Sequence, residues 1–220
     1  MQYLGLALYA EGRTDYQFLC PLLLRVCLSA CSLAAQCIEV GDVLPLDHSV
    51  SLNGASRADR IAQAAQDAAP AWNVLFVHAD ADGDAGRALR ESILPGLDLV
   101  HGMDLPRTAG VAVVPVRMTE SWVLADRDAL RAVFGSTLDD AALGLTFNSA
   151  ALERLADPKR MLDEAFAATR PAGRRAHAGV MALLNALGEQ VALEKLRVLP
   201  AFRALEADID TALRRLQILK

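Results

Sequence analysis

The sequence predicts an α/β fold, a mostly parallel Rossmann-like sheet flanked by helices, with a helical extension at the carboxyl end. Over residues 1–135, apolar runs typical of buried strands alternate with helix-like segments, as in sheets whose two faces are both covered. Beyond residue 136 no strand-like run follows, and prolines and glycines divide the chain into helical segments. We therefore expect an α/β domain at 1–135 and a helical extension at 136–220 packed on it.

The first half of the α/β part contains two strands and two helices. "YLGLALYAEG" is the first strand, and Thr14 or Asp15 is placed to cap a helix that runs to about residue 35. "QCIEVGDV" predicts a short second strand. Ser56 is the expected cap of the helix "RADRIAQAAQDAA", which Pro70 ends.

The second half repeats the strand–helix alternation. "NVLFVHA" is a third strand whose continuous apolar character predicts burial on both faces. The segment "AGRALRESILPGL" is helical up to the Pro95–Gly96 break, and "GVAVVPV" is the fourth strand. One helix, "TESWVLADRDALRAVFG", follows it, with Thr119 as cap and Gly135 as stop.

The four cysteines favour a reducing compartment. Cys20, Cys27, Cys31 and Cys37 lie in one segment without a C-x-x-C pair, which is poor spacing for zinc. The first three share one helical face, so we interpret them as free thiols packed as small apolar residues. Free thiols fit a reducing cytoplasm, and we expect a cytoplasmic protein.

The apolar segment at residues 18–38 has the length of a membrane span but not its composition. Pro21, Arg25 and Gln36 interrupt it. It also lacks a basic amino-terminal region and follows a strand-like run, which is untypical of a signal peptide. We expect a buried helix here and no membrane partner.

Several nucleotide and hydrolase motifs are missing. The chain contains no GxGxxG, no GxxxxGK[ST] and no GxSxG, which argues against a dinucleotide fold, a P-loop and an α/β-hydrolase. The fourth strand is followed by "VPVRMTES", without the lysine of a receiver domain. The net charge of -5 argues against a surface that holds nucleic acid by bulk electrostatics, so any such contact would need a local basic patch or bound cations.

Carboxylates gather at three predicted strand ends. Glu11 closes the first strand, Asp80, Asp82 and Asp84 follow the third in "HADADGDAG", and Glu120 lies shortly after the fourth. Ligands of open parallel sheets bind outside the carboxyl ends of the strands. On extended backbone, residues two apart project to the same side, so we expect Asp80 and Asp82 to point into one pocket.

Clustered like charges require a neutralising group. Oxygen ligands without cysteine or histidine suit Mg²⁺ or Mn²⁺ rather than zinc. Two such ions can stabilise the attacking and leaving oxygens of a phosphodiester displacement, and they need about four carboxylates. The other interpretation of "DADGDAG" is a loop whose aspartates cap the following helix. His78 is interpreted as a core or supporting residue more readily than as a ligand.

The basic residues that could hold a phosphate backbone lie mostly in the extension. They are Lys159 and Arg160 in "DPKRML", and Arg170, Arg174, Arg175 and His177 in "TRPAGRRAHAGV". A run of cations without an acid is a candidate nucleic-acid contact, and the alternative is a solvated loop between helices. Arg117 is a second candidate because it lies beside the acidic site. Trp72 and Trp122 are expected to be packing residues.

Three motifs in order resemble the TOPRIM superfamily, the magnesium-dependent domain of topoisomerases, primases and overcoming-lysogenization-defect nucleases. "YAEGRTD" matches its glutamate motif and "HADADGD" its D-x-D motif. With "MTESW", the set is similar to the bacterial TOPRIM-like domain of unknown function 4276, over residues 3 to about 134. The resemblance implies acid–base or metal-binding chemistry for Glu11, magnesium binding by Asp80 and Asp82 with Asp84 as a third ligand, and a second-metal role for Glu120.

One departure leaves the motif register open. The family's second motif has a glycine three residues after its second aspartate, whereas Gly83 follows Asp82 directly. If the true pair is Asp82 and Asp84, then Asp80 is the structural member.

The leading hypothesis is a Mg²⁺-dependent TOPRIM-type nuclease acting on DNA or RNA. The resemblance implies a role in bacterial phage defence, often with an ATPase partner protein, and a homo-oligomer is compatible with it. The alternative is a non-catalytic binding subunit whose helical extension docks the ATPase. A phosphohydrolase of the haloacid-dehalogenase type is less favoured, because "HADADGD" lacks the threonine or valine expected after the nucleophile pair.

Overall fold

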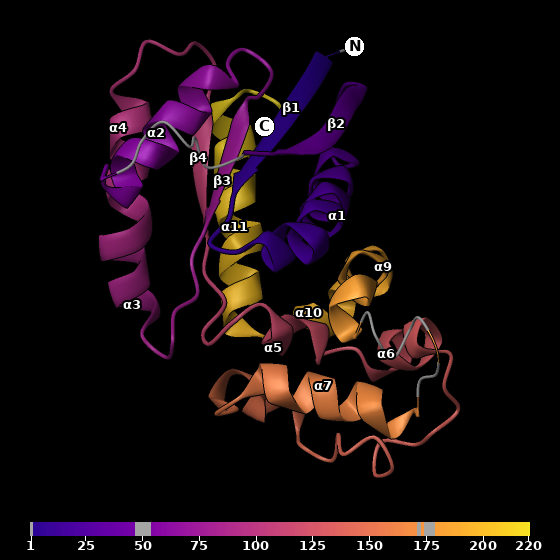
Figure 1. The fold of residues 1–220 in the computed structure, drawn as a ribbon. Coiled ribbons are helices and arrows are strands. Elements are labelled where there is room, and N and C mark those ends of the chain that lie inside the picture. Colours follow the sequence, from indigo (N-terminus) through magenta and orange to yellow (C-terminus); the bar gives the residue numbers. More distant parts are fainter. Residues whose placement is uncertain (1, 47–53, 171–172, 174–178) are drawn as a thin grey trace.

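A computed structural model describes residues 2–46, 54–170, 173 and 179–220. Four strands form one all-parallel sheet in the order β2-β1-β3-β4. Helices cover both faces of this sheet, and further helices lie below its carboxyl ends (Figure 1). The predicted α/β class is therefore confirmed.

Strands and helices alternate along the chain as far as β4, and helical elements follow. They are β1 (Gln2–Tyr9), α1 (Arg13–Cys31), β2 (Ile38–Pro45), α2 (Arg57–Asp67), β3 (Val74–His78), α3 (Ala85–Ala88), the π-helical turn η1 (Leu89–Ile93), α4 (Leu94–His101), β4 (Ala109–Val113), α5 (Glu120–Val123), α6 (Arg127–Phe134), the 3₁₀ turn η2 (Ser149–Arg154), α7 (Pro158–Ala168), the 3₁₀ turn η3 (Val180–Leu183), α9 (Leu184–Gln190), α10 (Leu193–Leu196) and α11 (Pro200–Arg215).

The strands alternate their side chains between two hydrophobic clusters. In β1, Leu4, Leu6 and Leu8 pack with α1 and α11, whereas Ala7 and Tyr9 pack with α2 and α4 on the other face. This period of two follows from the pleat of a strand. Because both faces are buried, the strand reads as a continuous apolar run, as the sequence predicted.

The expected helix starts are partly corrected. Helix α1 begins after Gly12, and Asp15 lies in its first turn, where its Oδ2 accepts a hydrogen bond of 2.9 Å from the Gly12 N–H. Neither Thr14 nor Asp15 is therefore the cap. Ser56 caps α2 as predicted, accepting from the Asp59 N–H. Gly135 ends α6 with φ 62, also as predicted.

The helix after β3 does not end at Pro95–Gly96 as expected. The π-helical turn η1 precedes Pro95, which then occupies the first turn of α4, where a backbone N–H has no helical partner to lose. Gly96 continues the helix because α2 packs closely there. A Cβ at this position would lie 2.6 Å from Cδ1 of Ile61.

The single helix expected at 119–135 is two helices, α5 and α6. Asp126 separates them, because its Oδ1 accepts from the Asp128 and Ala129 N–H groups as the cap of α6. Its Oδ2 accepts from the Ala192 N–H of the extension. Thr119 precedes α5, but its side chain makes no capping hydrogen bond.

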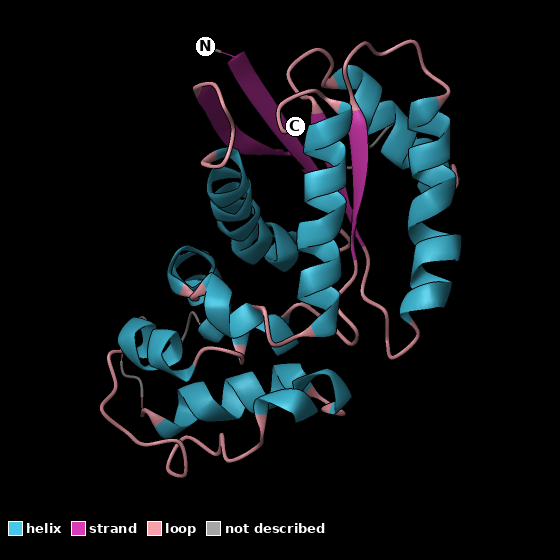
Figure 2. Cartoon of the chain, turned by 180° about the vertical axis from the view of Figure 1, so that it is seen from behind, coloured by secondary structure: helices cyan, strands magenta, loops and turns pink. Residues whose placement is uncertain are grey.

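The extension begins as a helical lobe and ends on the sheet. This helical lobe contains α7 and α10, which lie with α5 of the first part below the carboxyl ends of the strands in Figure 1. Helix α11 then returns along one face of the sheet, as Figure 2 shows. One hydrophobic cluster joins Val111 of β4 to Phe166 of α7 and Leu205 of α11. The two parts of the chain therefore share a core.

Two further expectations concern α1. Its cysteines are free, and burial raises the pKa of the Cys20 thiol to about 12, as for a packed rather than a reactive thiol. Among the helices of the described ranges, none combines the length and apolarity that a membrane crossing requires.

Candidate active site

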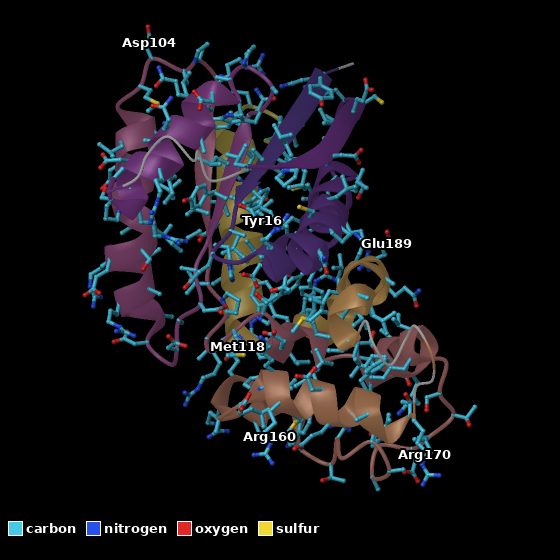
Figure 3. All side chains as sticks on the ribbon, in the orientation of Figure 1. Tyr16, Asp104, Met118, Arg160, Arg170 and Glu189 are labelled. Carbon is cyan, nitrogen blue, oxygen red and sulfur yellow. The ribbon has the colours of Figure 1, made fainter. Side chains whose placement is uncertain are left out.

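The candidate site lies at the carboxyl ends of β1 and β3 and in the segment that follows β4, next to the helical lobe. Glu11 is two residues past β1, Asp80 is two residues past β3, and Glu120 opens α5. Met118, in the segment that leads to Glu120, lies between the lower end of the sheet and helix α7 in Figure 3. The parallel order β1-β3-β4 places these three ends side by side.

Glu11 ties the ends of β1 and β3 together. Its Oε2 accepts a hydrogen bond of 3.1 Å from the Asp80 N–H. Its own N–H donates to Nδ1 of His78 across 3.5 Å, near the limit for such a bond. The first and second acidic motifs of the sequence are therefore in direct contact.

His78 is the buried centre of the site, with 0% of its surface exposed. Its Nδ1 faces the Glu11 N–H, and its Nε2 is turned toward the start of α5. That Nε2 lies 3.2 Å from Oγ1 of Thr119, which donates to Oδ1 of Asp15 across 2.9 Å. The network joins β3, α1 and the start of α5 beneath the carboxylates.

Asp80 carries an oxygen that lacks a partner in the described structure. Its side chain is 28% exposed, but Oδ1 is buried and accepts no hydrogen bond from a described residue. The Nε2 of His78 lies 3.3 Å away without the alignment of a hydrogen bond. A buried carboxylate oxygen without a partner is costly, so this atom is suited to a cation or a donor from a ligand.

Glu120 belongs to the same electrostatic cluster. Burial raises the pKa of its carboxyl, and the negative charges of Asp15 and Asp80 raise it further. Lys159, at the start of α7, opposes this shift. Three carboxylates from three elements therefore repel one another here with one nearby lysine to offset them.

Comparison with protein-family models, curated proteins and solved structures found no match to this chain.

The other two aspartates of "DADGD" lie differently from Asp80. Asp82 is exposed with φ 48, in the left-handed region, so the extended geometry expected to align it with Asp80 is absent. Asp84 caps α3, its Oδ1 accepting from the Arg87 N–H across 2.8 Å. The capping interpretation thus holds for Asp84, while Asp80 is the member that joins Glu11 and His78.

Arg117 lies directly against this turn. The Asp82 N–H donates to the Arg117 carbonyl and the Gly83 N–H to the Val116 carbonyl, at 3.2 and 2.8 Å. The guanidinium carbon of Arg117 would be 3.4 Å from a Cβ at Gly83. Its Nε is buried and donates to no described group, which leaves this cation available to an anion near the site.

The remaining basic candidates divide into three groups. Lys159 is exposed and close enough to influence Glu120. Arg160 pairs with Glu164 at 2.8 Å, and in Figure 3 both it and Arg170 are on the side of α7 away from the sheet. The other predicted contacts lie outside the described residues: Arg174, Arg175 and His177.

The sequence reasoning missed Asp15 and Thr119 as site residues. Both were assigned capping roles, yet they face each other and His78 across the strand ends. A signal for Asp15 was present, because the first turn of a helix that follows a parallel strand lies at the same sheet edge as the strand end. Thr119 carried no comparable signal, since its contact depends on how α5 packs.

The carboxylate oxygens at this site are of the kind that binds a hard cation, although they are not arranged as a complete metal site. Among the residues that the structure describes, no three His, Cys, Asp or Glu side chains stand in a metal-holding arrangement. The nearby donors are nevertheless carboxylate oxygens, and Oδ1 of Asp80 lacks a hydrogen bond within the described chain. Oxygen donors of this kind suit Mg²⁺ or Mn²⁺.

Proposed function

We propose that this chain is a Mg²⁺- or Mn²⁺-dependent nuclease that hydrolyses phosphodiester bonds in DNA or RNA. The observation that supports it most is the pair of Asp80 and Glu120, with Glu11 bound to the Asp80 N–H. Among the described residues, Oδ1 of Asp80 is buried without a hydrogen bond, and burial with the charge of Asp80 raises the pKa of Glu120. Such a cluster binds a divalent cation more readily than it persists alone. The likeness of "YAEGRTD", "HADADGD" and "MTESW" to TOPRIM motifs supports the same chemistry.

Asp80 and Glu11 are the proposed ligands, with Glu120 beside them. A bound divalent ion would polarise a phosphoryl oxygen and lower the pKa of a water molecule. His78 lies beside the Asp80 carboxylate, with Nε2 3.3 Å from its Oδ1, and Thr119 links His78 to Asp15. Glu120, whose pKa is raised, is the carboxylate best suited to accept a proton from water.

Arg117 and Lys159 are the proposed phosphate contacts. Arg117 adjoins the Asp82–Gly83 turn, and the charge of Lys159 lowers the pKa of Glu120, so both cations act on the acidic site. Each would bind a backbone phosphate without reading the base. Because the net charge of the chain is -5, a nucleic acid would be attracted by these two cations rather than by the overall charge. We include in this proposal an ATPase partner protein and a role in phage defence.

The test is cleavage of single- and double-stranded DNA and RNA with Mg²⁺ or Mn²⁺. Glu11→Gln and Asp80→Asn should each lower the rate by roughly 100-fold or more, as expected when an electrostatic group of a catalytic site is lost. Asp84→Asn is the matched control, because asparagine also caps a helix, and its rate should remain close to that of the wild type.

Unchanged cleavage in Asp80→Asn, with the fold intact by circular dichroism, would contradict this site. A strong loss of cleavage in Asp84→Asn would instead indicate that Asp82 and Asp84 are the metal-binding pair of the motif.

A non-catalytic binding subunit is the second candidate. It is favoured by the lack of a preformed metal-holding group among the described residues. In that case the helical lobe beside the site docks a partner such as an ATPase. Calorimetric Mg²⁺ binding without hydrolysis of any nucleic acid, or no binding at all, would support it.

A further inference from the structure

The two edges of the sheet are protected very differently. Strand β2, at one edge, carries Glu39, Asp42 and Pro45. Charges and proline on an edge strand prevent pairing with another chain. Strand β4, at the other edge, reads Ala-Gly-Val-Ala-Val and contains neither. The β4 edge therefore lacks the features that would keep a further strand away.

The outer peptide groups of β4 are open to such pairing. The Ala109 N–H donates to Asn73 and the Val113 carbonyl accepts from Ala79, both on the β3 side. Because successive peptide groups of a strand alternate direction, those of Gly110 and Ala112 point away from β3. In the described part of the chain, β4 is the last strand on this side.

A groove follows this edge between α11 and the η1–α4 helix. Figure 2 shows β4 lengthwise between these helices. The groove has a volume of about 300 Å³, with Ala109 to Ala112 along its floor and Leu94 and Leu97 on one wall. Leu94 is 38% exposed, so this wall of the groove presents an apolar side chain to solvent.

Opposite charges stand at the two ends of the other wall. Asp208 and Arg215 of α11 both line the groove and are separated by seven residues, so they lie on one stripe of the helix. No ion pair within 4 Å is formed by Asp208 among the described residues, and Arg215 contacts the ring nitrogen Nδ1 of His101 at 3.2 Å. Each charge therefore lacks a carboxylate–cation partner within the described chain.

We propose that the β4 edge pairs with the β4 edge of a second copy of this chain, antiparallel about a twofold axis. Gly110 and Ala112 of one copy would face Ala112 and Gly110 of the other, which extends the sheet across both subunits. The two α11 helices, related by this twofold axis, are then antiparallel to each other. In this arrangement Asp208 approaches Arg215 of the partner subunit, and Arg215 approaches Asp208 of the partner subunit.

The charge pattern favours a second copy over an unrelated peptide. A twofold contact needs a surface that is complementary to itself, and a stripe with one acid and one base at opposite ends has this property. The proposal is independent of the nuclease assignment, because its measurement is the oligomeric state and not the activity.

The experiment is a charge exchange on α11, followed by sedimentation velocity over a range of concentrations. The wild-type chain should be a dimer. Asp208→Arg and Arg215→Asp should each weaken the dimer roughly tenfold or more in Kd, because each places like charges opposite one another. The double variant Asp208→Arg/Arg215→Asp should restore it. Asp210→Arg, which alters the Asp210–Arg214 pair instead, is the matched control and should remain dimeric.

Hydrogen exchange locates the interface. Peptides that cover residues 109–113 should exchange more slowly in the wild-type dimer than in monomeric Asp208→Arg, because only the dimer protects the outer amides. A wild-type monomer at every concentration would overturn the proposal, even if an extended peptide then bound the groove. A dimer unaffected by both single exchanges would overturn it too.

Discussion

His78 connects the carboxylates at the strand ends to the protein core. It is fully buried, yet its ring atoms lie within 4 Å of Asp15, Asp80 and Thr119. Buried polar groups are retained where hydrogen bonds satisfy them, so each neighbour contributes to holding this ring. Its position explains why a histidine lies at the end of an otherwise apolar strand.

Thr119 is the residue through which this network can be tested. Thr119→Val keeps the shape of the side chain but removes the hydroxyl that donates to Asp15 across 2.9 Å. We expect a loss of about 1–3 kcal/mol in the free energy of unfolding, because the partly buried Oδ1 of Asp15 and the buried Nε2 of His78 then lose this partner. Urea denaturation followed by circular dichroism measures this.

Thr119→Ser is the matched control, since it keeps the hydroxyl and removes only a methyl group. Its stability should be closer to that of the wild type than that of Thr119→Val. A Thr119→Ser variant less stable than Thr119→Val would show that packing of the methyl group, rather than the hydroxyl, matters at this position.

At the scale of elements, α1 and α9 approach each other unusually closely. Gly188 of α9 lies against Phe18 and Pro21 of α1, and a Cβ on Gly188 would be 2.3 Å from the Phe18 carbonyl oxygen. Arg25 donates to the Gly188 carbonyl across 2.9 Å. The proline inside α1 therefore lies at a helix crossing, and the extension is held to the first helix there.

Gly188→Ala should separate these two helices. The added methyl group meets backbone that cannot rotate away, so we expect a loss of about 1–3 kcal/mol in unfolding free energy. Gly102→Ala, where the nearest backbone atom is 3.4 Å away, is the control and should change the stability little. A fluorescence-monitored urea titration compares them, and equal midpoints would disprove the close crossing.

At the scale of the whole molecule, α11 makes the extension part of the sheet domain. Phe202 is fully buried and packs edge-on against Trp122, with ring centroids 5.5 Å apart. Trp122 is itself buried, as expected for a packing residue, and Trp72 is too, with its Nε1 donating to Ala65. The aromatic contact joins α11 to α5, directly after the candidate site.

Phe202→Ala should therefore destabilise the chain as one unit. We expect a loss of about 3–5 kcal/mol, typical of a large aromatic side chain removed from a core. Thermal unfolding should still be a single transition, shifted to lower temperature. Arg214→Ala, on the exposed side of α11, should cost less than about 0.5 kcal/mol. A separate early transition in Phe202→Ala would show that the extension unfolds independently.

The local sequence was sufficient to predict the strands and several of the helix ends. Apolar runs predicted β1, β3 and β4, because burial on both faces leaves no polar alternation, whereas the edge strand β2 was predicted from the more polar "QCIEVGDV". Ser56 and Gly135 marked helix ends through short-range chemistry. Glu11, Asp80 and Glu120 could be placed at one edge because parallel strands end together.

Tertiary structure decided what depends on contacts distant in the sequence. Asp80 rather than Asp82 joins Glu11 because the turn after Ala81 is fixed by hydrogen bonds to the segment after β4. Gly96 continues α4 where Ile61 of α2 packs against it, and Asp126 separates α5 from α6 while it accepts from Ala192, the residue before α10. The return of α11 to the sheet, the Asp15–Thr119–His78 network and the open β4 edge follow from the same cause: each joins segments that a local pattern cannot relate.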